Sequence, residues 1–455
     1  MLIIGLYAAS KSKSTTQDYI LASRNVGPLA TALSAVSTCH SGFMFIGMIG
    51  FTYKFGVSAS WMVFGWLIGD YIAWKWVYPK LRSETEKSNT LTLPEFIVRH
   101  LSPNRKQKPQ WLIGGIIFIF VSLYAAAQLI AGSKALVIFL NTNQTIGILI
   151  GAGIVLIYSV SGGIRASIWT DVIQSIIMIL AMLGLLIVAL LKIGGPIELF
   201  IQLNNINPSL ANPITNFNLM SILYILGWCA FGIGVIGQPH ILTRPMAINS
   251  TTNMAKSRKI YLSWYTFFSS AAILIGLCTR VLLPELINND PELGLPLLAL
   301  QNLPEIFVGL ILAGIFSACI STADSQILVC ASTITQTFLP KKYQNILASR
   351  ITTLITLTLI VFFSIFASKS VFFWVIFSWS ILALIIAPLV FAQSYKIKLS
   401  PNTIFGSTII TIAFFYLWVF KLKLSSSINE VFPGFLIIGG FLFLVRKYNS
   451  YDQKY

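Results

Sequence analysis

The residues with the clearest potential for chemistry are two hydroxyl residues inside an apolar segment. Ser321 and Thr322 follow Ala318 within the apolar run 304–337. On a helix, residues three and four positions after Ala318 share its face, so one carbonyl and two hydroxyl oxygens lie together. A hard monovalent cation such as sodium takes neutral oxygen ligands of this kind. The alternative is that both hydroxyls bond to carbonyls of their own helix, as Ser and Thr in membrane helices usually do.

A second source of oxygens is a polar stretch at residues 37–42, within the apolar run 29–51. It reads Ser-Thr-Cys-His-Ser-Gly, a series in which continuous helix is weakly favoured. We expect an unwound stretch here, which frees backbone carbonyls near Ser37 and His40. Together with the three oxygens above, these carbonyls would give sodium about five neutral ligands.

The apolar run 218–238 is interrupted in the same way. Gly232, Gly234 and Gly237 lead into Gln-Pro-His at 238–240, so we expect this span to break as well. Two interrupted spans, five helices apart, are typical of inverted-repeat transporters, whose ligand sites lie between the broken helices. The alternative is that glycine and proline only kink packed membrane helices.

Three acidic residues lie within or at the ends of apolar runs, where ionisable groups are rare and usually functional. They are Asp70, Asp171 and Asp324. Asp171 lies six residues after Arg165, near one end of the run 166–191. It is either a way-station for a cation or an interfacial residue paired with Arg165, and the pattern favours neither.

The elements that must position these residues are membrane-spanning helices. The chain of 455 residues is 56% hydrophobic and 10% charged, with a mean hydropathy of +0.80, far outside the composition of soluble proteins. Apolar runs of about 18 or more residues, long enough to cross a bilayer as helices, recur along it. We expect twelve spans, near residues 29–51, 57–78, 112–140, 144–161, 166–191, 218–238, 260–283, 304–337, 349–367, 370–394, 402–420 and 431–445. Residues 2–9 are too short to span and lack a signal-peptide cleavage pattern, which favours a truncated first helix.

The net charge of +17 follows the topology of a membrane protein and does not indicate nucleic-acid binding. Lys and Arg alternate by loop: the segment 80–108 is rich in them, whereas 193–217 contains none. The positive-inside rule therefore places 80–108 and the C-terminus in the cytoplasm. We expect a multi-pass protein of the cell inner membrane.

Other site chemistries are poorly supported. All five cysteines lie within apolar runs, which predicts no disulfide, and the three histidines show no metal-ligand spacing. A membrane enzyme would need a His or carboxylate pair at a membrane face. His100 and Glu95 are the nearest approach to such a pair, but His100 lies in a basic loop. We expect no catalytic residues and no cofactor apart from sodium.

Six short motifs follow one another along most of the chain, at 19–24, 91–96, 161–163, 169–174, 237–244 and 321–326. Their sequence and order resemble the sodium/solute symporter family, and within it the sodium/proline symporter type. The resemblance implies an all-α integral membrane protein with the LeuT-type five-plus-five inverted repeat. It places a truncated helix and a loop at 1–28, the two repeats at 29–193 and 194–396, and two additional helices with a short cytoplasmic tail at 397–455.

The same resemblance assigns roles to residues of the predicted ion site. The implied sodium ligands are the backbone oxygens of Ser37, His40 and Ala318 and the hydroxyls of Ser321 and Thr322. Asp171 corresponds to a carboxylate associated with cation release toward the cytoplasm. Cys39 stands where proline-type members place an acidic residue, so sodium affinity or pH response is expected to differ.

The implied solute pocket lies at the membrane midplane between the two breaks. Its residues are Ser41, Phe43, Tyr124, Phe231, Val235 and Pro239. Proline-type members place an aromatic ring at the position of Val235, so the pocket should be larger or less polar there. A compact solute with an apolar body and a charged group fits such a lining.

These features predict a sodium-coupled symporter that imports a small polar solute by alternating access. The expected solute is an amino acid such as proline or a related zwitterion, and the expected partners are this solute, sodium and the lipid bilayer. One alternative is a transporter-like membrane sensor that signals through a separate partner. Another is a symporter for a carboxylate, a sugar or a vitamin.

Overall fold

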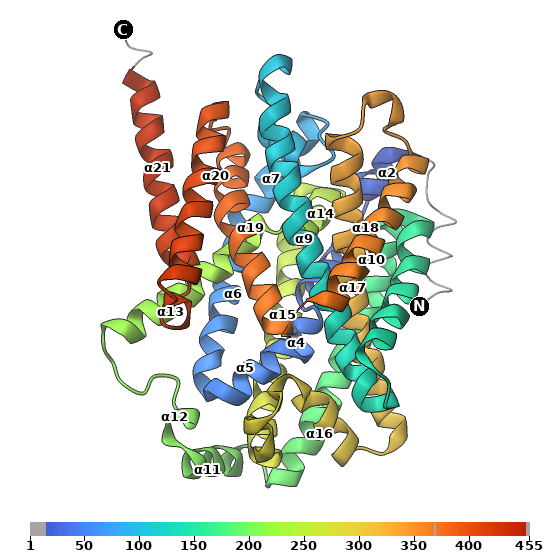
Figure 1. The fold of residues 1–455 in the computed structure, drawn as a ribbon, viewed down its shortest axis with the longest axis vertical. Helices are drawn as coiled ribbons and strands as arrows, with labels where there is room; N and C mark the ends of the chain where they lie inside the picture. The colour runs from blue at the N-terminus through green and yellow to red at the C-terminus, as the bar shows by residue number, and fades with distance from the viewer. Residues whose placement is uncertain (1–14, 368–369, 452–455) are drawn as a thin grey trace.

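The computed structural model describes residues 15–367 and 370–451, and helices form most of this part of the chain (Figure 1). These two ranges contain no β-strand, and one isolated bridge joins Val26 to Ile248. The first half of the chain forms α2 (Thr16–Leu21), α3 (Pro28–Cys39), α4 (Gly42–Phe45), α5 (Gly47–Phe55), α6 (Ser60–Ile72), α7 (Tyr78–Lys87), α8 (Leu93–Val98), α9 (Pro103–Leu140), α10 (Gln144–Ile193), α11 (Pro196–Ile206) and α12 (Pro208–Ala211). The second half forms α13 (Leu219–Ile233), α14 (Pro239–Ala247), α15 (Met254–Leu282), α16 (Gly294–Asn302), α17 (Glu305–Thr337), α18 (Ile346–Phe366), α19 (Val371–Ser394), α20 (Pro401–Phe415) and α21 (Val431–Tyr451). The truncated helix predicted at 2–9 lies outside the described residues.

The long helices run roughly along the long axis of the molecule, as in a membrane bundle (Figure 1). In the described ranges, nine helical stretches are long and apolar enough to cross a bilayer, and three shorter apolar helices accompany them. Gly42–Lys87 covers the second half of the predicted span 29–51 and all of the predicted span 57–78. Two further predicted spans form the single element α10, which kinks at Gly163, where φ is 58°. All twelve predicted spans are therefore mainly helical.

The two ends of the bundle differ in charge. The basic end carries α7 and α8, from the Lys- and Arg-rich segment 80–108, and the opposite end carries α11, α12 and α16 (Figure 1). We use these two names below. Which end faces the cytoplasm stays a prediction from the positive-inside rule.

The first predicted break occurs where α3 ends. His40 has φ −85° and ψ 65°, Ser41 is extended, and α4 begins at Gly42. Ser41 caps the new helix by accepting a hydrogen bond from the Phe43 backbone N–H at 3.2 Å. A Cβ atom on Gly42 would lie 2.4 Å from Cys319 Sγ, so only glycine lets the restarted helix pack this closely on α17.

The second predicted break follows α13. A 3₁₀ turn at Gly234–Gly237 leads to Gln238, which is extended, and Pro239 begins α14. The helix before this break packs closely on α6, because a Cβ atom on Gly232 would lie 2.0 Å from the carbonyl oxygen of Gly65. Glycines on both helices thus bring the second and sixth spans into contact.

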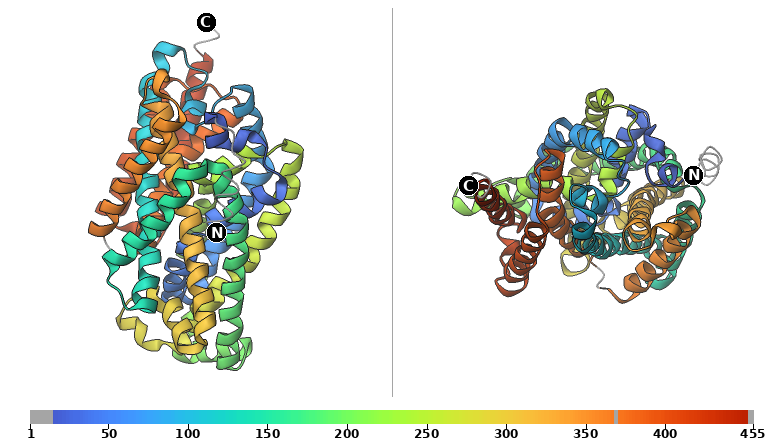
Figure 2. Two further views of the ribbon diagram at one scale, coloured as in Figure 1. Left: turned by 90° about the vertical axis from the view of Figure 1, so that its right-hand side faces the viewer. Right: turned by 90° about the horizontal axis from the view of Figure 1, so that it is seen from above.

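The last two helices lie at the edge of the bundle. Seen from above, α20 and α21 are on one side, away from α10, α17 and α18 (Figure 2). This position fits two helices added after a core. The domain boundaries at 29–193 and 194–396 rest on an internal repeat and stay a prediction.

Candidate functional site

The break after α3 lies against the middle of α17, and predicted sodium ligands meet there. Ser321 Oγ donates to the carbonyl of Ser37 and to that of Ala318, at 3.1 Å in each case. Thr322 Oγ1 donates to the carbonyl of Thr38 at 2.9 Å. Both hydroxyls therefore reach across to α3. The alternative was that both hydroxyls bond only to carbonyls of their own helix. Ser321 does so in part, through the Ala318 carbonyl, and for Thr322 the alternative is wrong.

His40 was predicted to contribute its backbone carbonyl, and its side chain serves a different contact. The imidazole Nε2 is 2.8 Å from Ser269 Oγ, and the ring centroid is 4.1 Å from that of Tyr265. Both partners belong to α15. The ring thus ties the break to α15. The predicted sodium ligand at this residue is the backbone carbonyl and not the ring.

The aromatic residues of the predicted pocket form a chain of ring contacts. Phe43 meets Trp66 edge-on, with 5.9 Å between ring centroids. Trp66 lies 5.6 Å from Phe231, which stacks on Trp379 at 5.5 Å. The Trp379 indole N–H also donates to the Phe231 carbonyl at 3.0 Å. Phe43 and Phe231 are therefore brought together through Trp66, which the sequence analysis did not identify.

Two other predicted pocket residues meet beside these rings. The Tyr124 hydroxyl faces the Ser41 side chain, and the Tyr124 ring contacts that of His240 at 5.2 Å. Val235 lies in the 3₁₀ turn of the second break and is fully buried, and Pro239 begins the helix after it. The six predicted residues thus come from the two breaks and from α9, and all are buried.

Three polar residues around this region were not among the predicted pocket residues. Gln128 Oε1 accepts from the Gly42 N–H at 2.9 Å, which leaves Nε2 with no hydrogen-bond partner in the described part of the chain. Gln238 donates through Nε2 to the Trp379 carbonyl at 3.1 Å, which leaves Oε1 unpaired there. Both ring nitrogens of His240 are also unpaired among the described residues. Unpaired buried donors and acceptors are the groups that a polar ligand can satisfy.

Asp171 lies on the basic-end side of the predicted ion site, in an ion pair. Its Oδ2 accepts from Arg244 Nη2 at 3.0 Å and from Ser34 Oγ at 2.6 Å, with both charged side chains at most 1% exposed. Arg244 also donates to Ser325 Oγ, and Ser325 Oγ donates to the Ser321 carbonyl at 2.7 Å. This network connects the predicted cation-release residue to the helix that carries the predicted ion site.

The alternative partner predicted for Asp171 was wrong. Arg165 pairs with Asp18 of α2, with Nε 3.2 Å from Oδ2, and it also donates to the carbonyl of Ala22. Helical residues six apart differ by about 240° around the axis, so Arg165 and Asp171 face different sides of α10. The true partner, Arg244, lies in one of the six motifs, but its pairing has no local signal.

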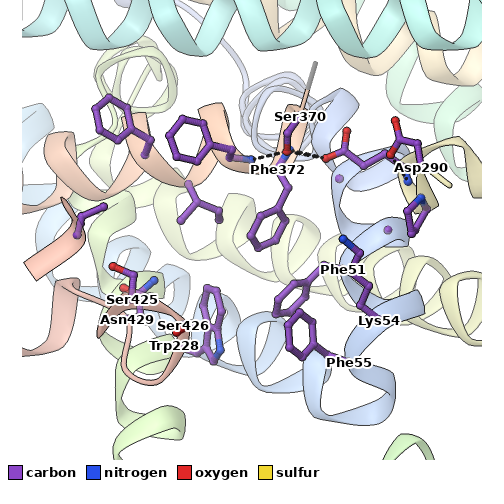
Figure 3. Close-up of a pocket in the computed structure, with 18 of the residues that line it drawn as sticks. Phe51, Lys54, Phe55, Trp228, Asp290, Ser370, Phe372, Ser425, Ser426 and Asn429 are labelled. Carbon is purple, nitrogen blue, oxygen red and sulfur yellow. Dashed lines mark hydrogen bonds between the residues drawn. The ribbon is translucent and has the colours of Figure 1, made fainter. Parts of the chain in front are cut away.

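A cavity of about 620 Å³ opens on the opposite-end side of the predicted pocket (Figure 3). Phe372, at the start of α19, lines this cavity. The Phe372 ring stacks on Phe51 with 4.7 Å between centroids, and it lies 5.6 Å from the ring of Phe43. Phe372 thus separates this cavity from a predicted pocket residue. We call the cavity the vestibule.

Glu292 holds Phe372 in this position. Its carboxylate accepts from the backbone N–H groups of Val371 at 3.0 Å and Phe372 at 2.9 Å and from the Ser370 hydroxyl. It also pairs with Lys134 Nζ of α9 at 2.7 Å. An anion at a helix N-terminus is favourable, so the pair fastens α19 to α9 beside the vestibule.

The model of the sodium:solute symporter family matches residues 19–409. The chain belongs to the sodium:solute symporter family. It is therefore a sodium-coupled transporter of a small solute and not an enzyme, as the sequence predicted. The predicted co-transported ion, sodium, is confirmed by the same match.

Two relatives within this family illustrate the likeness. The chain is 30% identical to the sodium/proline symporter 2 of Staphylococcus saprophyticus, over 99% of this chain and 91% of that protein. It is 31% identical to the high-affinity proline transporter of Bacillus subtilis, over 74% of this chain and 71% of that protein. The predicted resemblance to the sodium/proline symporter type is confirmed.

Solved structures support the predicted fold. A Na⁺-coupled sialic acid symporter, in a substrate-bound outward-open state, superposes with a TM-score of 0.77 at 18% identity, over 97% of this chain and 93% of that one. The nucleobase-cation-symport-1 transporter Mhp1 gives a TM-score of 0.58 at 14% identity, over 94% of this chain and 95% of that one. At these identities the likeness shows the fold alone. The predicted all-α, LeuT-type architecture is confirmed.

Proposed function

We propose that this symporter carries a small zwitterionic amino acid, with proline as the leading candidate. The observation that carries the proposal is the set of buried, unpaired polar atoms beside the aromatic rings at the two breaks. Gln128 Nε2 and a His240 ring N–H can donate to a carboxylate, and Gln238 Oε1 can accept from an ammonium group. The rings supply apolar walls for the body of the solute. The names of the two relatives favour proline.

The proposed sodium site is the oxygen cluster between α3 and α17. In the structure, the hydroxyls of Ser321 and Thr322 are directed at carbonyls of the break. A sodium ion at this point would take the lone pairs of these hydroxyls together with the carbonyls of Ser37, His40 and Ala318. The ion would then join α3 to α17 in place of the direct hydrogen bonds.

Asp171 is proposed to serve cations that leave this site toward the cytoplasm. Its Oδ1 has no hydrogen-bond partner within the described ranges, while Oδ2 is held by Arg244 and Ser34. One free carboxylate oxygen can meet a passing ion without breaking the pair. We also propose that the basic end and the C-terminus face the cytoplasm of a cell inner membrane.

Uptake by proteoliposomes tests the proposal. The purified chain would be reconstituted, given an inward gradient of sodium or of choline, and supplied with labelled proline. We expect uptake with sodium and not with choline, and competition from proline analogues and small betaines. Gln128→Ala should raise the KM for proline, whereas the matched polar change Gln202→Ala, on α11 at the opposite end, should not.

Two results would contradict the proposal. Sodium-driven uptake of a carboxylate, sugar or vitamin, with no competition from proline, would assign another solute class. Equal uptake with a sodium gradient and with a choline gradient would contradict the proposed sodium site. Because sodium binding alone can be followed by its effect on melting temperature, failure of the ion site and failure of the solute assignment are distinguishable.

A further inference from the structure

A second buried carboxylate, Asp70, lies outside the network described above. It is the eleventh residue of α6, about 15 Å along the helix from Ser60, which is about half the thickness of a bilayer core. Asp70 is 0% exposed. Neither carboxylate oxygen has a hydrogen-bond partner among the residues that the structure describes. A membrane carboxylate in this state calls for a function.

The groups that face Asp70 are neutral hydrogen-bond donors. The Tyr261 hydroxyl of α15 lies between the Asp70 carboxylate and the Cys39 thiol, and Tyr78 and Tyr265 complete the surroundings. The indole of Trp74 packs edge-on against the Tyr78 ring at 5.2 Å and obliquely against the Tyr261 ring at 5.4 Å.

Several of these donors are themselves unsatisfied. The hydroxyls of Tyr78 and Tyr261 and the indole N–H of Trp74 have no hydrogen-bond partners within residues 15–367 and 370–451. Unpaired donors thus lie near an unpaired acceptor in one buried cluster. We call Cys39, Asp70, Trp74, Tyr78, Tyr261 and Tyr265 the Asp70 cluster.

The cluster contains no counter-charge for Asp70. Lys75 and Arg258 are on the helical segments that adjoin it, but both cations lie over the ring of Tyr71, which is 39% exposed. On its remaining side α6 packs against α13 through glycine contacts such as Gly69 on Gly232, which bring no charge. An ionised carboxylate buried without a cation is strongly disfavoured, so Asp70 must be neutralised in this conformation.

A proton fits the cluster better than a metal cation. A sodium ion needs several oxygen lone pairs around it, whereas the groups that face Asp70 are phenol hydroxyls and a thiol. The same donors could hydrogen-bond to the carboxylate once its proton has left. The cluster can therefore hold Asp70 in either protonation state, which an exchangeable proton site requires.

The Asp70 cluster adjoins the break that carries the proposed sodium site. Cys39 ends α3, directly before His40, and the His40 ring contacts Tyr265 at 4.1 Å. Tyr265 in turn lies 5.8 Å from Tyr261. A positive charge at the break therefore favours the negative form of Asp70. Position 39, where the resemblance leads one to expect an acidic residue, thus faces a carboxylate supplied by α6.

We propose that Asp70 is an exchangeable proton site whose proton is released when sodium binds at the break. In this step the O–H bond of the carboxyl breaks, its electron pair stays on the carboxylate and the proton goes to water. The coupling rests on the proposed sodium site, whereas proton exchange at Asp70 does not. By linkage, protonation of Asp70 weakens sodium binding by the same factor by which sodium favours proton release.

Infrared spectroscopy of the reconstituted protein tests the proton site directly. Wild type should show a protonated-carboxyl band that decreases as the pH is raised. Asp70→Asn should lack this change. Glu95→Gln is the matched control, because Glu95 caps α8 through the backbone N–H groups of Leu91 and Thr92, and glutamine can keep such a cap. It should keep the band.

Proton release on addition of sodium chloride tests the coupling. In a weakly buffered suspension with a pH dye, wild type and Glu95→Gln should release protons, and Asp70→Asn should not. The apparent sodium affinity of wild type, read from melting temperature, should tighten as the pH is raised through the range in which the infrared band of Asp70 disappears. Asp70→Asn should lose this dependence and still bind sodium.

Three results would overturn the proposal. The first is an infrared band of Asp70 that does not change with pH. The second is proton release that persists in Asp70→Asn. The third is sodium-induced stabilisation of wild type with no proton release. A wild type that sodium does not stabilise at all would instead refute the proposed ion site, and the infrared titration would still decide whether Asp70 exchanges its proton.

Discussion

Asp171→Asn tests the role of the buried ion pair at the basic-end side of the proposed sodium site. Both partners are at most 1% exposed, and removing one member of a buried pair typically costs about 3–5 kcal/mol. Asparagine keeps one carbonyl oxygen for Ser34 and Arg244, and Arg244 keeps the His240 carbonyl at 2.8 Å. We therefore expect a loss of stability near the lower limit, about 3 kcal/mol.

The second step combines Asp171→Asn with Arg244→Gln in a double variant. The Arg244→Gln change removes the guanidinium charge that Asp171→Asn leaves unpaired. If the pair is what holds this region, the double variant should be more stable than Asp171→Asn, with a coupling energy of about 1–3 kcal/mol. Arg165→Gln is the matched control. Because Arg165 pairs with Asp18, it should not rescue Asp171→Asn. Melting temperature of the purified variants provides the measurement.

Transport separates an ion role from a purely structural one. If the Asp171 carboxylate serves sodium on its way out, the double variant should regain stability and still turn over slowly in sodium-driven uptake. Recovery of both stability and turnover in the double variant would refute the ion role. Rescue by Arg165→Gln, or a melting temperature unchanged in Asp171→Asn, would refute the pairing itself.

Three further outcomes follow from the geometry. Ser321→Ala or Thr322→Ala should weaken apparent sodium affinity about ten- to a hundredfold, because a hydrogen bond or ligand to a charge contributes about 1.5–3 kcal/mol; wild-type sodium dependence of uptake in both would place the ion elsewhere. Val235→Tyr should change the rank order of competing solutes without abolishing sodium-induced stabilisation, and an unchanged order would remove this position from the pocket. Glu292→Gln should lower stability by about 2 kcal/mol or more, and a melting curve equal to that of wild type would show that its contacts to α9 and α19 contribute little.

Much of the fold could be predicted from the sequence because its signals are local. Apolar runs of sufficient length must be helical in a bilayer, since no water is present to bond the backbone. The breaks at His40 and Gln238 were predictable for the same reason, because small polar residues, glycine and proline weaken the helix where they stand. The facing positions of Ala318, Ser321 and Thr322 followed from helical spacing alone.

The pairings between distant residues could not be predicted in this way. Arg244 and Asp171 are 73 residues apart, and helical periodicity gives each residue a face but not the helix that covers it. Trp66 reads as an ordinary membrane residue until it is seen between Phe43 and Phe231. Asp70 was identified as an unusual membrane carboxylate, but its lack of a counter-charge is a property of packing.

The hydrogen bonds indicate how ion occupancy could control access to the site. The contact between Ser321 and the Ser37 carbonyl joins α3 to α17 at the proposed ion site. One turn further along α17, Ser325 accepts from Arg244, which holds Asp171. An ion that replaces the first contact draws α3 and α17 to itself, and any resulting shift of α17 moves the partner of Arg244. Because interfaces of this kind have discrete arrangements rather than a continuous range, the loaded and empty forms of the proposed ion site should favour different states of the Arg244–Asp171 ion pair. A change of state at this pair then requires no contact between sodium and the pair before the ion leaves.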